Sequence, residues 1–172
     1  MGDRVRGYAH RVDIAGDVPS VWRALTDVAH LSRWCAPDAQ LRPRAGGLFR
    51  ASVDRVTQME AHIDVFDANR RMRLIYLPSA TLPAMDTAIV ADFILEPAPQ
   101  AAGGVILRVL GSGIPDGPGW DTQYKRMKVG WAAAMARLKV YVETQMNAGD
   151  AGAGTPTGGT PAAANRIKGA SK

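Results

Sequence analysis

The stretch Gly119–Glu143, GWDTQYKRMKVGWAAAMARLKVYVE, decides the fold because its large apolar side chains recur every three or four residues. This spacing lays one apolar stripe along a helix and leaves the opposite face polar. The stripe is formed by Tyr124, Met127, Trp131, Met135, Leu138 and Val142. The side chains expected to face water are those of Lys125, Arg126, Lys128, Arg137, Lys139 and Glu143. We therefore predict a long amphipathic helix over Trp120–Asn147.

A strand and two short helices are predicted near the amino terminus. Tyr8–Ile14 alternates larger apolar or aromatic side chains with small or charged ones, which is the period of a half-buried strand. Asp17 and Asp27 each precede apolar residues at helical spacing, so each carboxylate is placed to cap a helix. The second helix is expected to end at Ala36-Pro37-Asp38, because proline disfavours a helical residue before it.

Further strands fill the region between these helices and the long one. Their spacing, with turn residues between them, is typical of an antiparallel meander. The predicted strands are 48–53, 57–66, 72–77, 87–96 and 105–110, and the segments 97–104 and 111–119 are predicted to be a loop and a mobile linker. One long helix packed on such a sheet predicts an α+β fold, and this packing often leaves a cavity between helix and sheet.

The alternation in the longest strand predicts which of its side chains face the core. Met59, Ala61, Ile63 and Val65 fall on one face, and Glu60, His62, Asp64 and Phe66 fall on the other. The apolar set belongs inside, so the carboxylates and His62 are expected to face outward. This orientation matters for function, because acid–base chemistry in a cavity would need these groups to point inward.

Length and composition predict one domain followed by a tail. The chain has 172 residues, of which 47% are hydrophobic, as in ordinary soluble domains. Residues 148–172 consist mostly of Gly, Ala, Pro and Thr and cannot bury enough surface to offset their ordering entropy. We therefore predict a folded domain over residues 1–147 and a disordered tail over residues 148–172.

Several classes of protein are disfavoured by composition. No apolar run approaches the roughly 18 residues of a membrane span, and no secretory signal is recognisable, so a cytoplasmic location is expected. Cys35 is the single cysteine, which excludes an intrachain disulfide. The net charge of +5 is scattered and not interleaved with aromatic residues, so nucleic-acid binding is not expected.

Three blocks of sequence resemble a known family. Val21–Asp27 (VWRALTD) with Arg33-Trp34, then Arg44–Arg50 (RAGGLFR), then Gly130-Trp131 with Leu138-Lys139 resemble the opening, the glycine turn and the closing helix of the family named for the activator of heat-shock protein 90 ATPase. This family is part of the START-like (SRPBCC) superfamily. The resemblance implies a helix-grip fold, in which a curved antiparallel sheet wraps around a long carboxyl-terminal helix and two short helices follow the first strand.

The sequence also departs from the family pattern. Cys35 stands where many relatives carry a second tryptophan, which implies a smaller side chain in the wall of the expected cavity. The eukaryotic co-chaperone has a separate amino-terminal domain, whereas only seven residues precede Tyr8 here, so no such domain is expected. A role in chaperone activation is therefore only weakly implied, because likeness of fold does not fix function.

The candidate ligand-binding residues combine an apolar wall with polar groups that could orient a ligand. They are His10, Trp34, Cys35, Arg50, Tyr76, Phe93, Trp131 and Met135. The alternative is that the apolar members simply fill the core and that His10 is a structural histidine with a hydrogen-bond partner. Cys35 could act as a nucleophile only beside a base, and a small buried thiol is the alternative.

No catalytic residue, metal site or cofactor is predicted. His10, His30, His62 and Cys35 have neither the spacing of a helical metal pair nor that of a Cys-x-x-Cys motif. A glycine-rich dinucleotide fingerprint is absent from the sequence. The leading hypothesis is non-enzymatic binding or sensing of a small hydrophobic molecule. The alternatives are a cyclase- or hydrolase-type enzyme of the same superfamily and a chaperone-interacting module, and a homodimer is possible.

Overall fold

The computed structural model describes residues 4–52, 58–99 and 104–148. The predicted tail over 148–172 lies outside these residues apart from Ala148, as do Val53, Thr57 and residues 100–103 of the loop predicted over 97–104. Within the described residues, seven strands form one antiparallel sheet in the order β1-β7-β6-β5-β4-β3-β2. These strands are β1 (Val5–Ala15), β2 (Gln40–Leu41), β3 (Leu48–Ala51), β4 (Met59–Asp67), β5 (Arg71–Tyr76), β6 (Val90–Pro97) and β7 (Gly104–Pro115).

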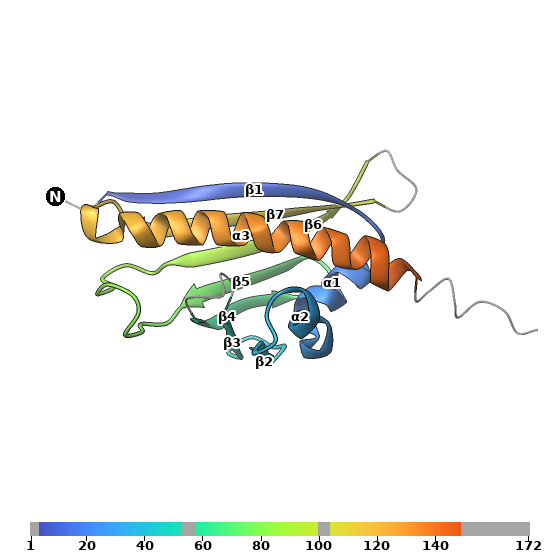
Figure 1. Ribbon diagram of the computed structural model, residues 1–172, viewed down its shortest axis with the longest axis horizontal. Helices are drawn as coiled ribbons and strands as arrows, with labels where there is room; N and C mark the ends of the chain where they lie inside the picture. Colours follow the sequence, from blue (N-terminus) through green and yellow to red (C-terminus); the bar gives the residue numbers. More distant parts are fainter. Residues whose placement is uncertain (1–3, 53–57, 100–103, 149–172) are drawn as a thin grey trace, which may run out of the picture.

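The helices are arranged as the helix-grip fold requires, so the predicted fold class is confirmed. Helices α1 (Val18–Thr26) and α2 (Val28–Trp34) follow β1, and a short 3-10 turn over Pro118–Trp120 leads into α3 (Asp121–Tyr141). Figure 1 shows α3 running along the sheet, with β1 and β7 on one side of it and α2 with β2 and β3 on the other. Aspartates cap both short helices as predicted: Asp17 Oδ1 accepts from the Ser20 amide at 2.7 Å, and Asp27 Oδ1 accepts from the Ala29 amide at 2.8 Å.

The apolar stripe of α3 packs on the sheet in the predicted phase. Met127, Trp131, Met135, Leu138 and Val142 are buried, and the half-buried Tyr124 packs against the same core. Lys125, Arg126 and Lys128 are exposed as predicted, whereas Arg137, Lys139 and Glu143 are half-buried. The helix continues as a π-helical turn over Val142–Met146, which keeps Val142 and Met146 buried.

The end of the long helix is tied to β1 by two hydrogen bonds on Ala15. The Ala15 amide donates to Glu143 Oε1 at 2.9 Å, and the Asn147 side-chain amide donates to the Ala15 carbonyl at 2.9 Å. Because these contacts join the first strand to the last turn of the helix, they close the grip at this end.

Two predictions about the strands are wrong in detail. The pairing of β4 with β5 shifts register between Ile63 and Val65, and a bulge of this kind changes the face on which later side chains lie. Phe66 therefore packs on the inner side, with its ring centroid 5.1 Å from that of Trp22, instead of facing outward beside Asp64. Met59, Ala61 and Ile63 are buried as predicted.

The second correction concerns the predicted linker at 111–119. Strand β7 continues through Gly111 to Pro115, where it pairs with β1 and β6. Gly111 is required in this strand, because a Cβ atom there would lie 2.3 Å from the ring of Tyr8. Gly111 thus makes room for an aromatic ring, and residues 111–115 belong to the strand.

Candidate ligand-binding site

The structure brings Tyr76, Phe93 and Trp131 into direct contact between the sheet and α3. The Trp131 Nε1–H group donates to the Tyr76 hydroxyl at 3.0 Å, and the Phe93 ring meets the Trp131 ring edge-on at a centroid distance of 5.0 Å. Phe49 of β3 approaches the same indole at 6.5 Å. Met135 lies one helical turn beyond Trp131 and is also buried. Four of the predicted residues therefore form part of one packed cluster.

Tyr8 belongs to this cluster and was missed as a candidate site residue. Burial, followed by the proximity of Tyr76 and a hydrogen bond to it, raises the pKa of Tyr8 above its ordinary value, so its phenol stays protonated. Tyr8, Tyr76 and Trp131 thus satisfy one another's polar groups within an apolar core, as buried polar groups require. The available signal was the alternation in β1, which places Tyr8 on the same face as Ile14.

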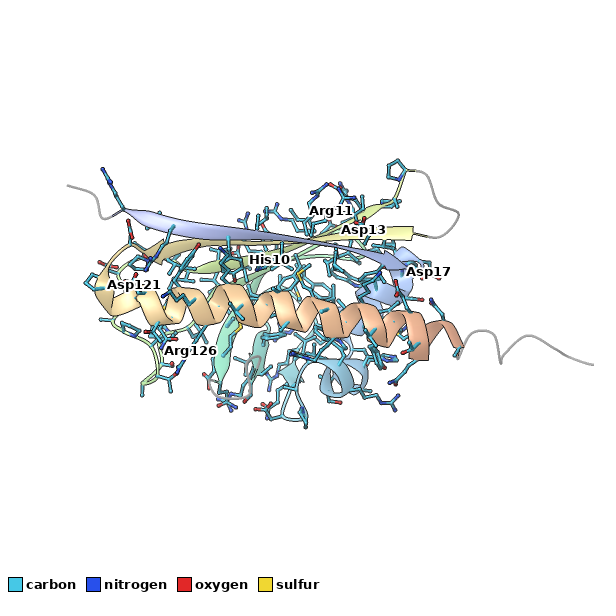
Figure 2. The ribbon with its side chains drawn as sticks, turned by 45° about the horizontal axis from the view of Figure 1, so that its top comes forward. His10, Arg11, Asp13, Asp17, Asp121 and Arg126 are labelled. Carbon is cyan, nitrogen blue, oxygen red and sulfur yellow. The ribbon has the colours of Figure 1, made fainter. Side chains whose placement is uncertain are left out.

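His10 lies between β1 and α3 (Figure 2), and its ring contacts the backbone of the helix. Its Nε2 atom lies 2.7 Å from the Lys128 carbonyl oxygen. A carbonyl oxygen only accepts, so Nε2 carries the hydrogen and donates it. The ring is half-buried and its centroid lies 5.3 Å from that of Tyr8. His10 therefore links β1 to α3, as expected of a structural histidine that has a hydrogen-bond partner.

Arg50 lies on the face of the sheet opposite to this cluster. Its neighbours Phe49 and Ala51 are buried on the inner side, whereas Arg50 pairs across the strands with Glu60 and forms an ion pair with it. Glu60, His62 and Asp64 alternate with the buried Met59, Ala61 and Ile63, so they also face outward. The acid–base groups of β4 therefore do not join the aromatic residues around Trp131.

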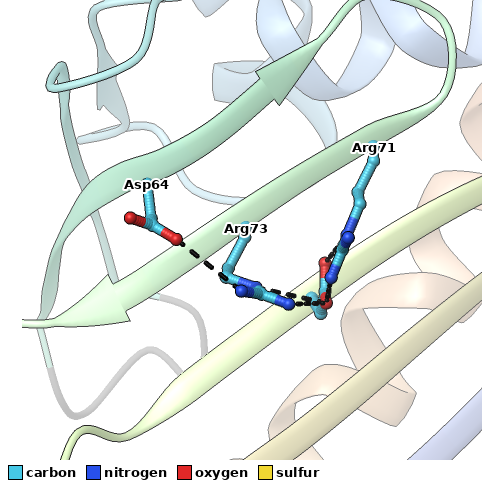
Figure 3. Close-up of polar contacts among 4 residues, drawn as sticks. Asp64, Arg71 and Arg73 are labelled. Carbon is cyan, nitrogen blue, oxygen red and sulfur yellow. Dashed lines mark hydrogen bonds and ion pairs between the residues drawn. The ribbon is translucent and has the colours of Figure 1, made fainter.

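An ionic cluster occupies the outer face of the sheet. Asp92 of β6 accepts from Arg71 at 2.9 and 2.5 Å and from Arg73 at 3.3 and 3.2 Å, and Arg73 also lies 3.7 Å from Asp64 (Figure 3). Burial alone would raise the pKa of Asp92, but the hydrogen bonds from Arg71 and then Arg73 outweigh it and lower the pKa. Asp92 is buried, with only 7% of the residue exposed, although it lies on the outer face.

A pocket of about 580 Å³ opens beside the remaining two predicted residues, Trp34 and Cys35. It lies where the end of α2, the residue after β3 and the carboxyl-terminal part of α3 meet, and its other described lining residues are Ser32, Arg33, Ala36, Pro37, Asp38, Ser52 and Arg137. Trp34 is fixed in the wall because its Nε1–H group donates to the Ala24 carbonyl at 2.8 Å. Both Trp34 and Cys35 belong to the main apolar core, so they separate this pocket from the interior.

The electrostatics of this pocket keep Cys35 unreactive. Burial raises the pKa of its thiol to about 12, with Arg137 acting to lower the pKa and Asp38 to raise it. A thiol with this pKa is protonated at neutral pH, and the thiolate is the form that attacks. Cys35 is therefore a small apolar element of the wall.

A second pocket, of about 380 Å³, lies on the other side of the same residues. It shares Arg33, Trp34 and Arg137 with the first pocket and is also lined by Ala136, Val140, Tyr141 and Gln145. The Arg137 Nε–H group donates to the Trp34 carbonyl at 3.1 Å, which ties α3 to the end of α2. Sequence reasoning missed Arg33 and Arg137 as site residues, because their proximity depends on a contact between segments about a hundred residues apart.

The eight predicted residues thus fall into separate places. Tyr76, Phe93, Trp131 and Met135 lie in the inner cluster, Trp34 and Cys35 line the pocket, His10 lies between β1 and α3 and Arg50 lies on the outer face. Their role as ligand contacts stays a prediction.

Among the described residues, no group of three or more His, Cys, Asp or Glu side chains is arranged to hold a metal ion. The helices in the described part also include none with the length and hydropathy needed to cross a bilayer.

The fold defines a helix-grip protein of the START-like kind, and comparison with known proteins gives the family. Residues 17–143 match the model of the family described as activator of Hsp90 ATPase homolog 1-like protein. The chain belongs to this family, and the resemblance noted in the sequence is confirmed. No functionally curated protein matches the chain at a significant level.

Solved structures similar to this chain share its fold at low sequence identity. A protein from Mesorhizobium loti has a TM-score of 0.68 and 23% identity over 81% of this chain and 98% of its own. The Aha1 dimer from Colwellia psychrerythraea has a TM-score of 0.67 and 16% identity over 81% of this chain and 97% of its own. A protein of the dynemicin biosynthetic locus has a TM-score of 0.61 and 20% identity over 80% of this chain and 47% of its own. At these identities the likeness establishes the fold.

Proposed function

We propose that the chain binds a small hydrophobic molecule without transforming it, and that the ligand enters at the pocket beside Trp34 and Cys35. The observation that carries this proposal is the pocket itself. Its volume of about 580 Å³ lies within the range of small-molecule sites, roughly 300–1,000 Å³. Its inner wall consists of the buried Trp34 and Cys35, which also belong to the apolar core.

The placement of reactive groups supports binding over catalysis. The thiol in the pocket wall is protonated at neutral pH, since burial raises its pKa to about 12. The carboxylates and the histidine of β4 lie on the outer face of the sheet. A cyclase or hydrolase of this superfamily would need acid–base groups within reach of a bound ligand, so this arrangement favours a carrier or sensor.

The free buried thiol also agrees with a reducing compartment, and the proposal therefore places the protein in the cytoplasm. Cell fractionation with a tagged full-length chain tests this placement. Recovery in a secreted fraction would contradict it.

Native mass spectrometry of the purified full-length protein tests ligand binding directly. A co-purifying small molecule is expected, and adding that molecule should raise the melting temperature with increasing concentration, because a ligand that binds only the folded state stabilises it. If no small molecule co-purifies and a panel of fatty acids, sterols and aromatic compounds leaves the melting temperature unchanged, the proposal is wrong.

A matched pair of variants locates the site. Ser32 is half-buried at the pocket, so Ser32→Phe should fill part of the pocket and reduce the ligand-induced rise in melting temperature. Ser112→Phe places the same ring on the exposed outer side of β7 and should leave this rise unchanged. Equal effects of the two variants would place the ligand elsewhere.

A second candidate function, a protein-interaction module, is favoured by the outer face of α3. Val129 and Val140 are 66% and 60% exposed, and they lie three helical turns apart on the face directed away from the sheet. The family description points to a chaperone ATPase as one partner, and the Colwellia dimer points to a second copy as another.

Sedimentation and chaperone ATPase assays of the full chain, each with wild type and Val140→Glu, test this second candidate. A complex that Val140→Glu disrupts would support it. A monomer that leaves the ATPase rate unchanged would contradict it.

A further inference from the structure

We infer that the ligand of this pocket carries an anionic group, which Arg33 and Arg137 bind at its mouth. The inference rests on the proposed function and specifies the chemical class of the ligand. The described linings of the pockets of about 580 and 380 Å³ have three residues in common, namely Arg33, Trp34 and Arg137. Both guanidinium groups therefore stand at the boundary of the two pockets, where a ligand lying in either one meets them.

The charge of the lining favours an anion over a cation. Among the residues that the structure describes, the lining of the smaller pocket includes both arginines and no acidic side chain. The described lining of the larger pocket includes one carboxylate, that of Asp38, which already accepts from the Ser52 amide at 3.2 Å, the Ser52 hydroxyl at 2.8 Å and the Gln58 side chain at 3.3 Å. The described lining therefore carries two cationic groups and one carboxylate, which accepts from other donors.

Arg137 is held in position before any ligand arrives. Its Nε–H group donates to the Trp34 carbonyl at 3.1 Å, so the plane of the guanidinium is set by a contact with the pocket wall. Arg33, immediately before Trp34 in the last turn of α2, is exposed. Planar guanidinium groups bind carboxylate, sulfonate or phosphate oxygens through paired hydrogen bonds, and a group that is already oriented loses less entropy on binding.

The apolar part of the ligand is accounted for by the rest of the lining. Trp34, Cys35, Ala36 and Pro37 provide an apolar surface next to the arginines in the larger pocket. A neutral molecule of the same shape would bury that surface but would partly desolvate the two charges without compensation. The site therefore fits an amphiphile with an apolar body and one anionic end.

A pair of fluorescent probes that differ by a single sulfonate tests the inference. Titrations of the full chain with 1-anilinonaphthalene-8-sulfonate and with neutral N-phenyl-1-naphthylamine give a dissociation constant for each. We expect the anionic probe to bind at least about tenfold more tightly, since hydrogen bonds to charged groups are stronger than neutral ones. Decanoate should displace the anionic probe, and decylamine should not.

Charge variants connect the preference to the two arginines. Arg33→Gln, and separately Arg137→Gln, should reduce the ratio of anionic-probe to neutral-probe affinity severalfold. Arg108→Gln removes one positive charge from the outer face of the sheet, where Arg108 is paired with Glu96, and should change neither affinity. Circular dichroism of each variant confirms that it is folded.

The outcomes separate this inference from the proposed function. Equal affinity for the two probes would contradict the inference that the ligand carries an anionic group, but it would still support binding of a hydrophobic molecule. A preference that is insensitive to both arginine variants would overturn the assignment of the site. Failure of both probes and of decanoate to bind would overturn the proposed function and this inference together.

Discussion

The inner cluster around Trp131 and the wall of the pocket beside Trp34 belong to one apolar core, but they are built differently. In the cluster, Tyr8, Tyr76 and Trp131 satisfy one another's polar groups and are each less than a tenth exposed. In the pocket, arginines, serines and one aspartate line an open hollow. The difference indicates that stability depends mainly on the first region and recognition on the second, so the two properties should be separable by mutation.

The largest effect is expected from emptying the core beneath the long helix. Leu138 has no exposed surface and lies in the middle of the apolar stripe, so Leu138→Ala should lower the free energy of unfolding by about 2–5 kcal/mol. Val140→Ala, on the exposed face of the same helix, should change it by no more than about 0.5 kcal/mol. Urea unfolding measures both, and similar losses would contradict the helical phase.

The second prediction removes a hydroxyl from the inner cluster. Tyr76→Phe takes away the acceptor for the Trp131 Nε1–H group and the partner of Tyr8, and an unsatisfied buried polar group costs about 1–3 kcal/mol. Urea unfolding should show this loss, while probe affinity at the pocket stays the same. Tyr124→Phe removes a hydroxyl that bonds the Gly7 carbonyl at an exposed site and should cost less. A larger loss of probe affinity than of stability would mean that the cluster contacts the ligand.

Features fixed by residues close together in the sequence were predicted well, and features fixed by contacts between distant segments were not. The stripe of α3 and the caps Asp17 and Asp27 are set within a few residues, so local periodicity is sufficient to find them. Burial of Trp131 follows from the same stripe. Its partners Tyr76 and Phe93 are among the predicted ligand-binding residues. Their contact with Trp131 depends on how strands β5 and β6 pair, which the sequence alone does not give.

The features that sequence reasoning missed depend on pairing across the sheet. A bulge between Ile63 and Val65 moved Phe66 to the inner face, and an unbroken alternation gives no sign of such a shift. Pairing with β1 and β6 extends β7 through a glycine-rich segment that resembles a linker. Arg137 lines the pocket, where its Nε–H group donates to the Trp34 carbonyl. No local sequence pattern predicts this contact.

The third prediction concerns acid and the outer face of the sheet. Because the pKa of Asp92 is lowered in the folded state, its ion pairs stabilise the protein above the ordinary aspartate pKa of about 3.9, and this contribution is lost as the pH falls through the lowered value. Urea unfolding should therefore show a larger deficit for Asp92→Asn at pH 7 than at pH 3. Asp67→Asn, at the exposed pair with Arg70, should show little difference between the two pH values. A deficit for Asp92→Asn that grows in acid would contradict the direction of the shift.

The smallest effect on stability is expected at the pocket mouth, where the effect on binding should be clear. Arg33 is exposed and, within the described part of the chain, none of its contacts is an ion pair, so Arg33→Gln should change the free energy of unfolding by no more than about 0.5 kcal/mol. The same variant should lower affinity for the anionic probe severalfold, because it removes one of the two cations at the pocket boundary. Paired urea unfolding and probe titration on one preparation measure both quantities. Arg33→Gln and Tyr76→Phe should then have opposite profiles, with binding affected in the first and stability in the second. If each variant changed both properties in proportion, the pocket and the inner cluster would be one coupled unit, and the ligand would reach the interior past Trp34 and Cys35 instead of stopping at the mouth.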